Sequence, residues 1–173
     1  MTQNVSLWLV PQPDDHAYLQ DIIDQLAVQY QAPHFSPHVT VAGHLQVPDH
    51  ASLSTLAAAT PFLQLQNQGL DHSSELFRTV YIRTSLADQL VALRQKVYQQ
   101  WPVNISKPFM PHISLIYKKL AAPERQMIIQ SLSLKKTFIF DALAVVQPQQ
   151  DWTAVETWQI LERWPLAANT MPQ

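Results

Sequence analysis

Two short stretches of the sequence have the same pattern: a proline, a histidine, a β-branched residue, a hydroxyl residue and an aliphatic residue. They are residues 37–41 and 111–115, and their histidines lie 74 positions apart in a chain of 173 residues. Each histidine begins a stretch that reads as a β-strand, with a helical pattern before it and another after it. The repetition predicts two related halves whose β layers face each other across one cleft.

Hydrophobic spacing in the rest of the chain agrees with this arrangement. Helical spacing predicts helices over residues 14–30, 49–59, 86–101 and 123–132, and Asp14 or Asp15 is expected to cap the first of them. Strand patterns cover residues 5–10, 38–42, 62–70, 77–83, 112–117, 138–146 and 155–161. The chain is therefore predicted to be an α+β protein of two pseudo-symmetric lobes, each with an antiparallel sheet and outer helices, whose sheets face a central cleft.

The size of the chain favours a single domain over residues 1–173. A chain of this length that is 47% hydrophobic can bury one sizeable core. Its 13 prolines against two glycines favour stiff turns over flexible linkers. No boundary between separable domains is predicted.

Charge and cysteine content restrict the partners. A net charge of −2 argues against a broad basic surface that binds long nucleic acids, so the expected ligand is a small molecule. Lys107, Lys118 and Lys119 flank the second stretch and are expected to form a solvated basic face. With no cysteine, no basic and apolar leader and no long apolar segment, the chain is expected to be cytoplasmic, without a membrane role or an evident obligate protein partner.

Local context distinguishes the two repeated histidines from the others. Five of the seven histidines have serine or threonine two residues later, so the bare spacing is a weak signal. Only His38 and His112 begin apolar strands, in which residues two apart face the same side. Thr40 is therefore expected beside His38, and Ser114 beside His112.

These four side chains suit the cleavage of a phosphodiester by water. The reaction needs a base to take the proton of water and an acid to protonate the leaving oxygen, and imidazole can do either near neutral pH. Thr40 and Ser114 could donate hydrogen bonds to the non-bridging oxygens. His38 and His112 could thus divide the proton transfers without a metal.

The histidines also allow a structural and a metal-binding interpretation. One such motif alone is more typical of a structural histidine, but two copies are hard to explain by packing because burying two imidazoles costs free energy. His34 and His38 have the spacing of helical metal ligands, yet the flanking prolines oppose a helix there. The remaining histidines have no acidic residue at ligand spacing and are expected at the surface or in turns: His16, His44, His50 and His72.

The repeated motifs and their flanks resemble the 2H phosphoesterase superfamily, and most closely the cyclic phosphodiesterases of plants and yeast. The resemblance covers nearly the whole chain. It includes residues 6–8, 37–41, 77–83, 109–117 and 156–158. The paired histidine motifs are specific to the superfamily, whereas the flanks that indicate the subfamily are less specific.

The resemblance implies metal-independent hydrolysis, with no cofactor, of a cyclic phosphate on ribose. The substrate is a nucleoside 2′,3′-cyclic phosphate, opened to the 2′-phosphate, or ADP-ribose 1″,2″-cyclic phosphate, opened to the 1″-phosphate. His38 and His112 match the catalytic histidines, and Thr40 and Ser114 match the phosphate ligands. His112 is assigned as base and His38 as acid, although the reverse stays open because it depends on how the substrate lies.

Three aromatic residues are predicted to bind the rest of the substrate. Phe77 matches the position where the family places an aromatic ring against the nucleobase, and stacking there would contribute about 1–3 kcal/mol. Trp8 shares a strand face with Ser6, and Tyr117 matches a family tyrosine but reaches the cleft only if its strand bends. Phe77 could instead be a core residue, and Trp8 could be buried where the lobes meet. Core positions are expected for Trp152, Trp158 and Trp164.

Two alternative functions remain open at this point. One is a phosphodiesterase of the same superfamily that acts on RNA ends or 2′-5′ oligonucleotides, which would make short RNA ends a partner. The other is a module that binds nucleotides or phosphate without catalysis. Intact histidines and hydroxyls in both motifs favour an enzyme.

Overall fold

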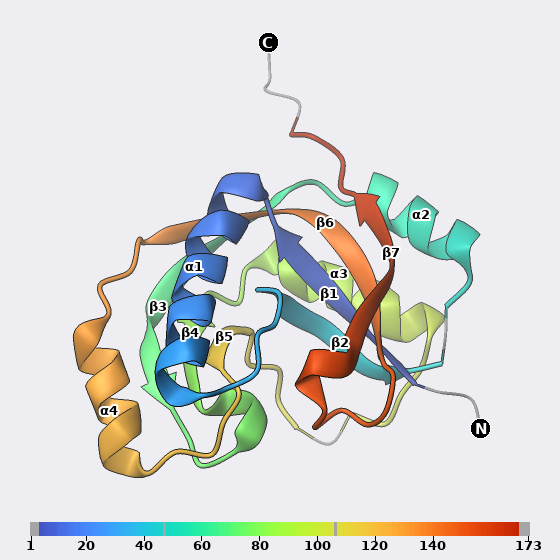
Figure 1. The fold of residues 1–173 in the computed structure, drawn as a ribbon. Coiled ribbons are helices and arrows are strands. Elements are labelled where there is room, and N and C mark those ends of the chain that lie inside the picture. The colour runs from blue at the N-terminus through green and yellow to red at the C-terminus, as the bar shows by residue number, and fades with distance from the viewer. Residues whose placement is uncertain (1–3, 47, 106, 170–173) are drawn as a thin grey trace.

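The computed structural model describes residues 4–46, 48–105 and 107–169. These residues form seven strands, four α-helices and two short 3-10 turns (Figure 1). The strands are β1 (Val5–Pro11), β2 (Val39–Leu45), β3 (Leu63–His72), β4 (Val80–Thr84), β5 (His112–Ile116), β6 (Thr137–Pro148) and β7 (Trp158–Pro165). The helices are α1 (Pro13–Tyr30), α2 (His50–Ala58), α3 (Asp88–Gln100) and α4 (Ala122–Ser131), and the turns are η1 (Leu76–Arg78) and η2 (Val155–Thr157).

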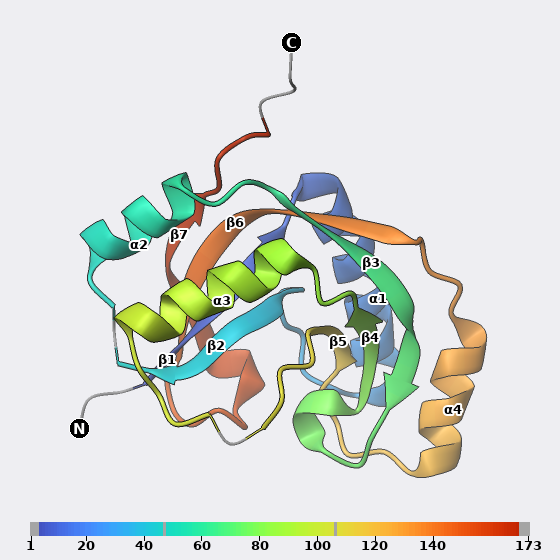
Figure 2. The same ribbon diagram turned by 180° about the vertical axis from the view of Figure 1, so that it is seen from behind.

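All seven strands join in one antiparallel sheet that closes on itself. The order is β1-β2-β5-β4-β3-β6-β7, and β1 also pairs with β6, so that six strands form a ring and β7 extends from β6. Helices α1 and α3 lie on opposite sides of the strands (Figures 1 and 2). The predicted α+β class with antiparallel strands and outer helices is confirmed, and the strands of the two lobes are continuous with each other.

The two repeated strands meet at a single point of this ring. Strands β2 and β5 pair through Val39 and Ile113 alone, and β2 then continues to Leu45 along β1. Both paired residues are fully buried. A single residue pair thus connects β2 to β5, the strands that carry the two motifs. A cleft can open next to this short pairing.

The start of α1 differs from the prediction. The N-cap is Gln12, which makes no side-chain capping bond, and Pro13 supplies a φ angle suited to the first turn. Asp14 and Asp15 both lie inside the helix. Asp15 is buried, accepts a hydrogen bond from the Ile139 amide at 2.6 Å and pairs with Lys135, so it connects α1 to β6 instead of capping the helix.

Two strands begin later than their hydrophobic patterns predict. Residues 76–78 and 155–157 form the 3-10 turns η1 and η2, so β4 begins at Val80 and β7 at Trp158. A threonine hydroxyl closes each turn: Thr79 donates to the Leu76 carbonyl at 3.0 Å, and Thr157 donates to the Ala154 carbonyl at 2.7 Å. Such local bonds compete with the strand ladder.

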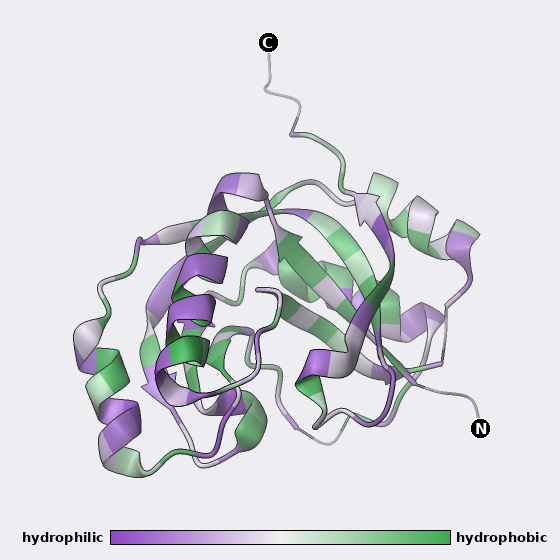
Figure 3. Cartoon of the chain, viewed as in Figure 1, coloured by the Kyte–Doolittle hydropathy of each residue, from purple (hydrophilic) through white to green (hydrophobic). Residues whose placement is uncertain are grey.

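Strand β1 is apolar on both faces, which explains its central place. Leu7 and Leu9 enter the main core, whereas Trp8 and Val10 pack with alanines and a valine of β6 in a second, smaller cluster. Hydrophobic residues accordingly concentrate in the strands, while α1 alternates between hydrophilic and hydrophobic positions (Figure 3). Within the described residues, none of the helices combines the length and apolar content needed to cross a bilayer.

Candidate active site

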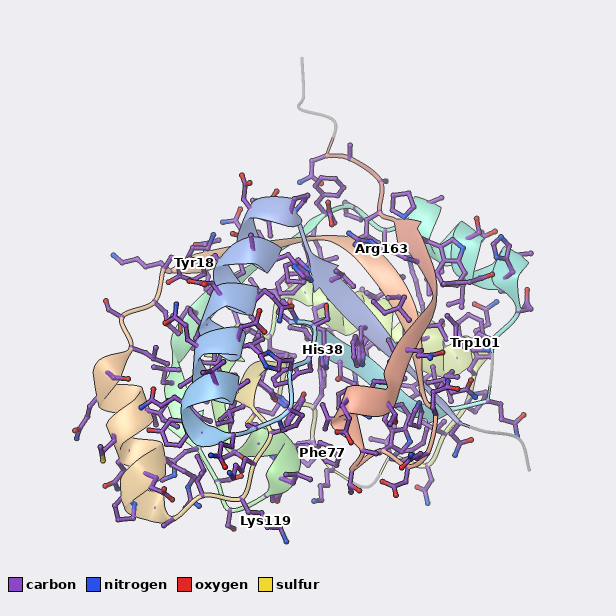
Figure 4. All side chains as sticks on the ribbon, viewed as in Figure 1. Tyr18, His38, Phe77, Trp101, Lys119 and Arg163 are labelled. Atoms are coloured by element: carbon purple, nitrogen blue, oxygen red, sulfur yellow. The ribbon has the colours of Figure 1, made fainter. Side chains whose placement is uncertain are left out.

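A cavity of about 300 Å³ receives all seven of the predicted site residues. The predicted residues on its walls are Trp8, His38, Thr40, Phe77, His112, Ser114 and Tyr117. They come from β1, β2, η1 and β5 and from the segments next to these elements. Figure 4 places His38 near the centre of the molecule and Phe77 below it in the same view. Residues up to 109 positions apart in the sequence therefore meet at one hollow.

The pairing of β2 with β5 explains why the two motifs meet. Val39 lies opposite Ile113, and both side chains point into the core. In an antiparallel pair, the residues that flank such a pair project from the other face of the sheet. The flanking residues are His38, Thr40, His112 and Ser114, so all four side chains face the cavity.

The two histidine rings are held in the same way. The Nδ1 of His38 lies 2.8 Å from the carbonyl oxygen of Ser36, and the Nδ1 of His112 lies 2.9 Å from that of Met110. A carbonyl oxygen can only accept, so in each neutral ring Nδ1 carries the hydrogen and Nε2 carries the lone pair. Each carbonyl belongs to the residue before the motif proline. The repeated proline-histidine step therefore fixes the tautomer as well as the position of the ring.

Burial keeps both rings neutral. It lowers the pKa of His38 to about 3; the Ser36 carbonyl opposes this shift, and the charge of His112 adds to it. Burial also lowers the pKa of His112; the carbonyls of Met110 and Phe77 oppose this shift, and the positive charge of Arg78 adds to it. At neutral pH both Nε2 atoms are thus proton acceptors in the free protein.

Trp8 supports His38 directly. Its ring stacks on the His38 ring with centroids 3.5 Å apart and planes 3° from parallel. The Trp8 Nε1 donates to the Ser6 hydroxyl at 3.1 Å, and that hydroxyl donates to the Ala42 carbonyl at 3.2 Å. Trp8 lines the cavity as predicted, but one face of its ring is covered by His38 and is not available to a ligand.

Three aromatic rings in mutual contact form part of the cavity wall. Phe77 is 38% exposed and contacts Tyr117 edge-on at 5.7 Å between ring centroids. Tyr117 follows the last residue of β5, so strand alternation no longer governs its direction, and burial raises its pKa. Trp158 completes the wall, 5.4 Å from Tyr117 and 6.0 Å from Phe77.

Trp152 and Trp158, predicted to be core residues, are half-buried and line the cavity, and Trp158 also packs against the core. They lie in and just after the connection between β6 and β7, where η2 breaks the strand pattern that suggested a core position. The Trp158 Nε1 donates to the Trp152 carbonyl at 3.1 Å, which links the two residues. Trp164 is buried in the core as predicted.

Sequence reasoning also missed Arg78 and His44. Arg78 is held by Glu75, with Nη2 and Nε at 2.5 and 3.1 Å from one carboxylate oxygen, and it places positive charge on the cavity wall. His44 is exposed, lines the cavity and has a φ of 57°, a left-handed conformation that is uncommon outside glycine. Arg78 was not predicted because it lies in a 3-10 turn where the sequence pattern indicates a strand. His44 was not predicted because its positive φ angle cannot be inferred from the sequence pattern.

Other polar residues that the sequence drew attention to have structural partners. His34 pairs with Asp24, and His50 pairs with Glu162, each at 2.8 Å. Lys118 donates to the carbonyls of Tyr30 and Gln31 at the end of α1, so the solvated basic face predicted for it is wrong. Across residues 4–46, 48–105 and 107–169, no group of three histidine, cysteine or acidic residues is placed to hold a metal ion.

Comparison with known proteins identifies relatives over most of the chain. The sequence model of the 2′-5′ RNA ligase superfamily matches residues 11–152. A cyclic phosphodiesterase of Arabidopsis thaliana is 22% identical over 163 residues, covering 89% of this chain and 90% of that protein. The crystal structure of E. coli LigT complexed with 3′-AMP has a TM-score of 0.59 and 14% identity, covering 95% of this chain and 98% of that chain. A crystal structure described as a phosphoesterase has a TM-score of 0.56 and 15% identity, covering 96% and 99%. These two structures share the fold described above.

Proposed function

Because this chain belongs to the 2′-5′ RNA ligase superfamily of 2H phosphoesterases and is a phosphodiesterase, we propose that it hydrolyses cyclic phosphates on ribose without a metal. The substrates are nucleoside 2′,3′-cyclic phosphates, opened to 2′-phosphates, or ADP-ribose 1″,2″-cyclic phosphate, opened to the 1″-phosphate. The proposal is carried by one observation. Two histidines with the same fixed tautomer, each with a hydroxyl two residues on, line a single cavity.

In this proposal the two imidazoles divide the proton transfers. His38 takes a proton from water as the water oxygen bonds to phosphorus, and His112 gives its proton to the 3′ oxygen as the bond from phosphorus to that oxygen breaks. Solvent then exchanges the proton left on His38 and restores the one lost from His112. This assignment reverses the one made from sequence. Deeper burial and stacking on Trp8 favour the neutral form of His38, as a base requires, whereas His112 is less buried and can take up a proton more readily.

Thr40 and Ser114 are proposed to bind the non-bridging oxygens of the phosphate. The Ser114 hydroxyl donates to the Phe77 carbonyl at 3.0 Å, so this donor must turn toward a bound phosphate. Thr40 is half-buried on the neighbouring strand β2. Two hydroxyl donors on opposite sides of one phosphorus would stabilise the charge that grows in the transition state.

The size of the cavity and the charge of the chain favour a small substrate over an RNA end. Its volume of about 300 Å³ lies at the lower limit of small-molecule sites. Phe77 lines the cavity with a partly exposed ring on which a base can stack. An oligonucleotide would require a longer groove with more positive charge, and the chain has a net charge of −2.

A substrate panel tests the proposal. The protein is treated with EDTA and then given adenosine 2′,3′-cyclic phosphate, ADP-ribose 1″,2″-cyclic phosphate and oligonucleotides with cyclic ends. Hydrolysis of the small substrates, with the 2′-phosphate as the sole adenosine product by chromatography, is the expected result. Tight nucleotide binding with no turnover of any cyclic phosphate would instead identify a binding module.

The pH dependence gives a second test. We expect kcat/KM for adenosine 2′,3′-cyclic phosphate to follow a bell-shaped curve with its maximum below pH 6.5. The rising limb reports loss of a proton from the base, and the pKa of His38 is lowered to about 3. The falling limb reports loss of the proton of the acid, and the pKa of His112 is also lowered. Arg78→Gln removes a positive charge that lowers the pKa of His112, so the falling limb should move to higher pH. A maximum above pH 7.5, or no movement in this variant, would contradict the assignment.

A further inference from the structure

The place where β2 and β5 separate is filled by a side chain from α3. Beyond the pairing of Val39 with Ile113, β2 has β1 along one edge and makes no further pairing with β5 along the other. Arg94, in the middle of α3, donates from Nη1 to the carbonyl oxygen of Val41. Its charged group thus supplies a hydrogen bond to β2 at a position that β5 does not reach.

The same guanidinium also contacts the segment that leads to the second motif. Its central carbon lies 4.0 Å from the centre of the Phe109 ring and 4.6 Å from that of Tyr98. Phe109 is followed directly by Met110, whose carbonyl orients the His112 ring at 2.9 Å. On the other side, Val41 follows Thr40. One planar cation therefore contacts Val41, which adjoins Thr40, and Phe109, which adjoins the residue that orients His112.

We propose that Arg94 is a positioning residue that sets the spacing between the His38–Thr40 half and the His112–Ser114 half of the site. The inference rests on the function proposed above, because it assigns Arg94 an effect on that reaction. Arg94 is absent from the residues that line the cavity, so its effect passes through Val41 and Phe109. Planarity is essential to the role, since a guanidinium can donate at its edge while it stacks on a ring through its face, and an ammonium cannot do both.

Kinetics test the consequence for turnover. Arg94→Met is expected to lower kcat for adenosine 2′,3′-cyclic phosphate by about 10–100-fold, because a displacement of about 1 Å at reacting groups can cost about 100-fold. KM should change by less than about 3-fold, since the phosphate ligands themselves remain. Arg94→Lys keeps the charge without the planar contact and should fall between wild type and Arg94→Met. Lys96→Met, on an exposed position of the same helix, is the matched control and should retain wild-type kcat.

Hydrogen exchange, measured without substrate, tests whether Arg94 stabilises the two segments that it contacts. In Arg94→Met, the amides of residues 39–45 and those of residues 109, 110, 112 and 113 are expected to exchange at least about 10-fold faster, while β6 and β7 keep wild-type protection. If Arg94→Met does not fold, the same comparison is made with Arg94→Lys. Unchanged exchange in both segments, or equal acceleration throughout the chain, would overturn the proposal. This readout is independent of turnover, so failure of the wild-type protein to open any cyclic phosphate would refute the proposed function and leave the exchange result to decide the role of Arg94.

Discussion

Replacing His112 with alanine is expected to lower kcat on a cyclic ribose phosphate by about 10²–10⁴-fold, or about 3–5 kcal/mol of barrier. The same loss is expected for His38→Ala. Each ring has its Nδ1 hydrogen bonded to a backbone carbonyl, so only Nε2 is available for proton transfer. Steady-state turnover of adenosine 2′,3′-cyclic phosphate measures the effect. KM should change far less, because the hydroxyl donors remain.

His34→Ala is the matched control for both variants. His34 also has a serine two residues later, but it pairs with Asp24 and is absent from the walls of the cavity. It should keep wild-type kcat. The double variant His38→Ala, His112→Ala should lose little more than either single variant, because groups that act as a unit are not additive. Retention of more than about half of the activity in either single variant would remove that histidine from the mechanism.

Between pH 6.5 and pH 3, the free energy of unfolding is expected to fall by about 4–5 kcal/mol less in His38→Gln than in the wild type. In the folded protein burial lowers the pKa of His38 to about 3, whereas in the unfolded chain the ring titrates near its ordinary value of 6.5. Between these values the unfolded state binds the extra proton. Stability is therefore complete above pH 6.5 and is lost as the pH falls toward 3. Glutamine does not titrate, so the variant lacks this contribution.

Urea unfolding at pH 7 and pH 4 measures this effect. The free energy of unfolding of the wild type should fall by about 3 kcal/mol more over this interval than that of His38→Gln. Thr40→Val changes a residue two positions from His38 without changing a titrating group, and should keep the wild-type pH dependence. Equal pH slopes for the wild type and His38→Gln would show that the folded protein admits a proton to this ring as easily as the unfolded chain does.

The four central site residues could be placed from sequence because they depend on local rules. Strand alternation puts Thr40 on the face of His38 and Ser114 on the face of His112, and the repetition of the motif indicates that the two strands are related. The structure brings all four to one cavity. Their catalytic and binding roles stay predictions until the variants above are measured.

The rest of the cavity depends on contacts that have no local signal. Phe77 reaches it from a 3-10 turn that a threonine hydroxyl closes, although the hydrophobic pattern there favours a strand. Trp158 reaches it because a second such turn delays the start of β7. The sequence predicts Asp14 or Asp15 as the cap of α1, but Asp15 accepts a hydrogen bond from the Ile139 amide and pairs with Lys135, which lies just before β6. Long-range partners override propensity in each case.

Closure of the strand ring has a consequence for how the molecule is made. Strand β1 has β2 on one edge and β6 on the other, so its second neighbour comes from residues 137–148, far along the chain. Neither half of the chain can therefore form all its strand pairs alone. In a nascent chain on the ribosome, the edge of β1 that pairs with β6 stays unpaired until most of the protein has emerged. Pairings at such separation slow folding. We expect a chaperone that shields exposed strand edges to raise the yield of active protein during synthesis.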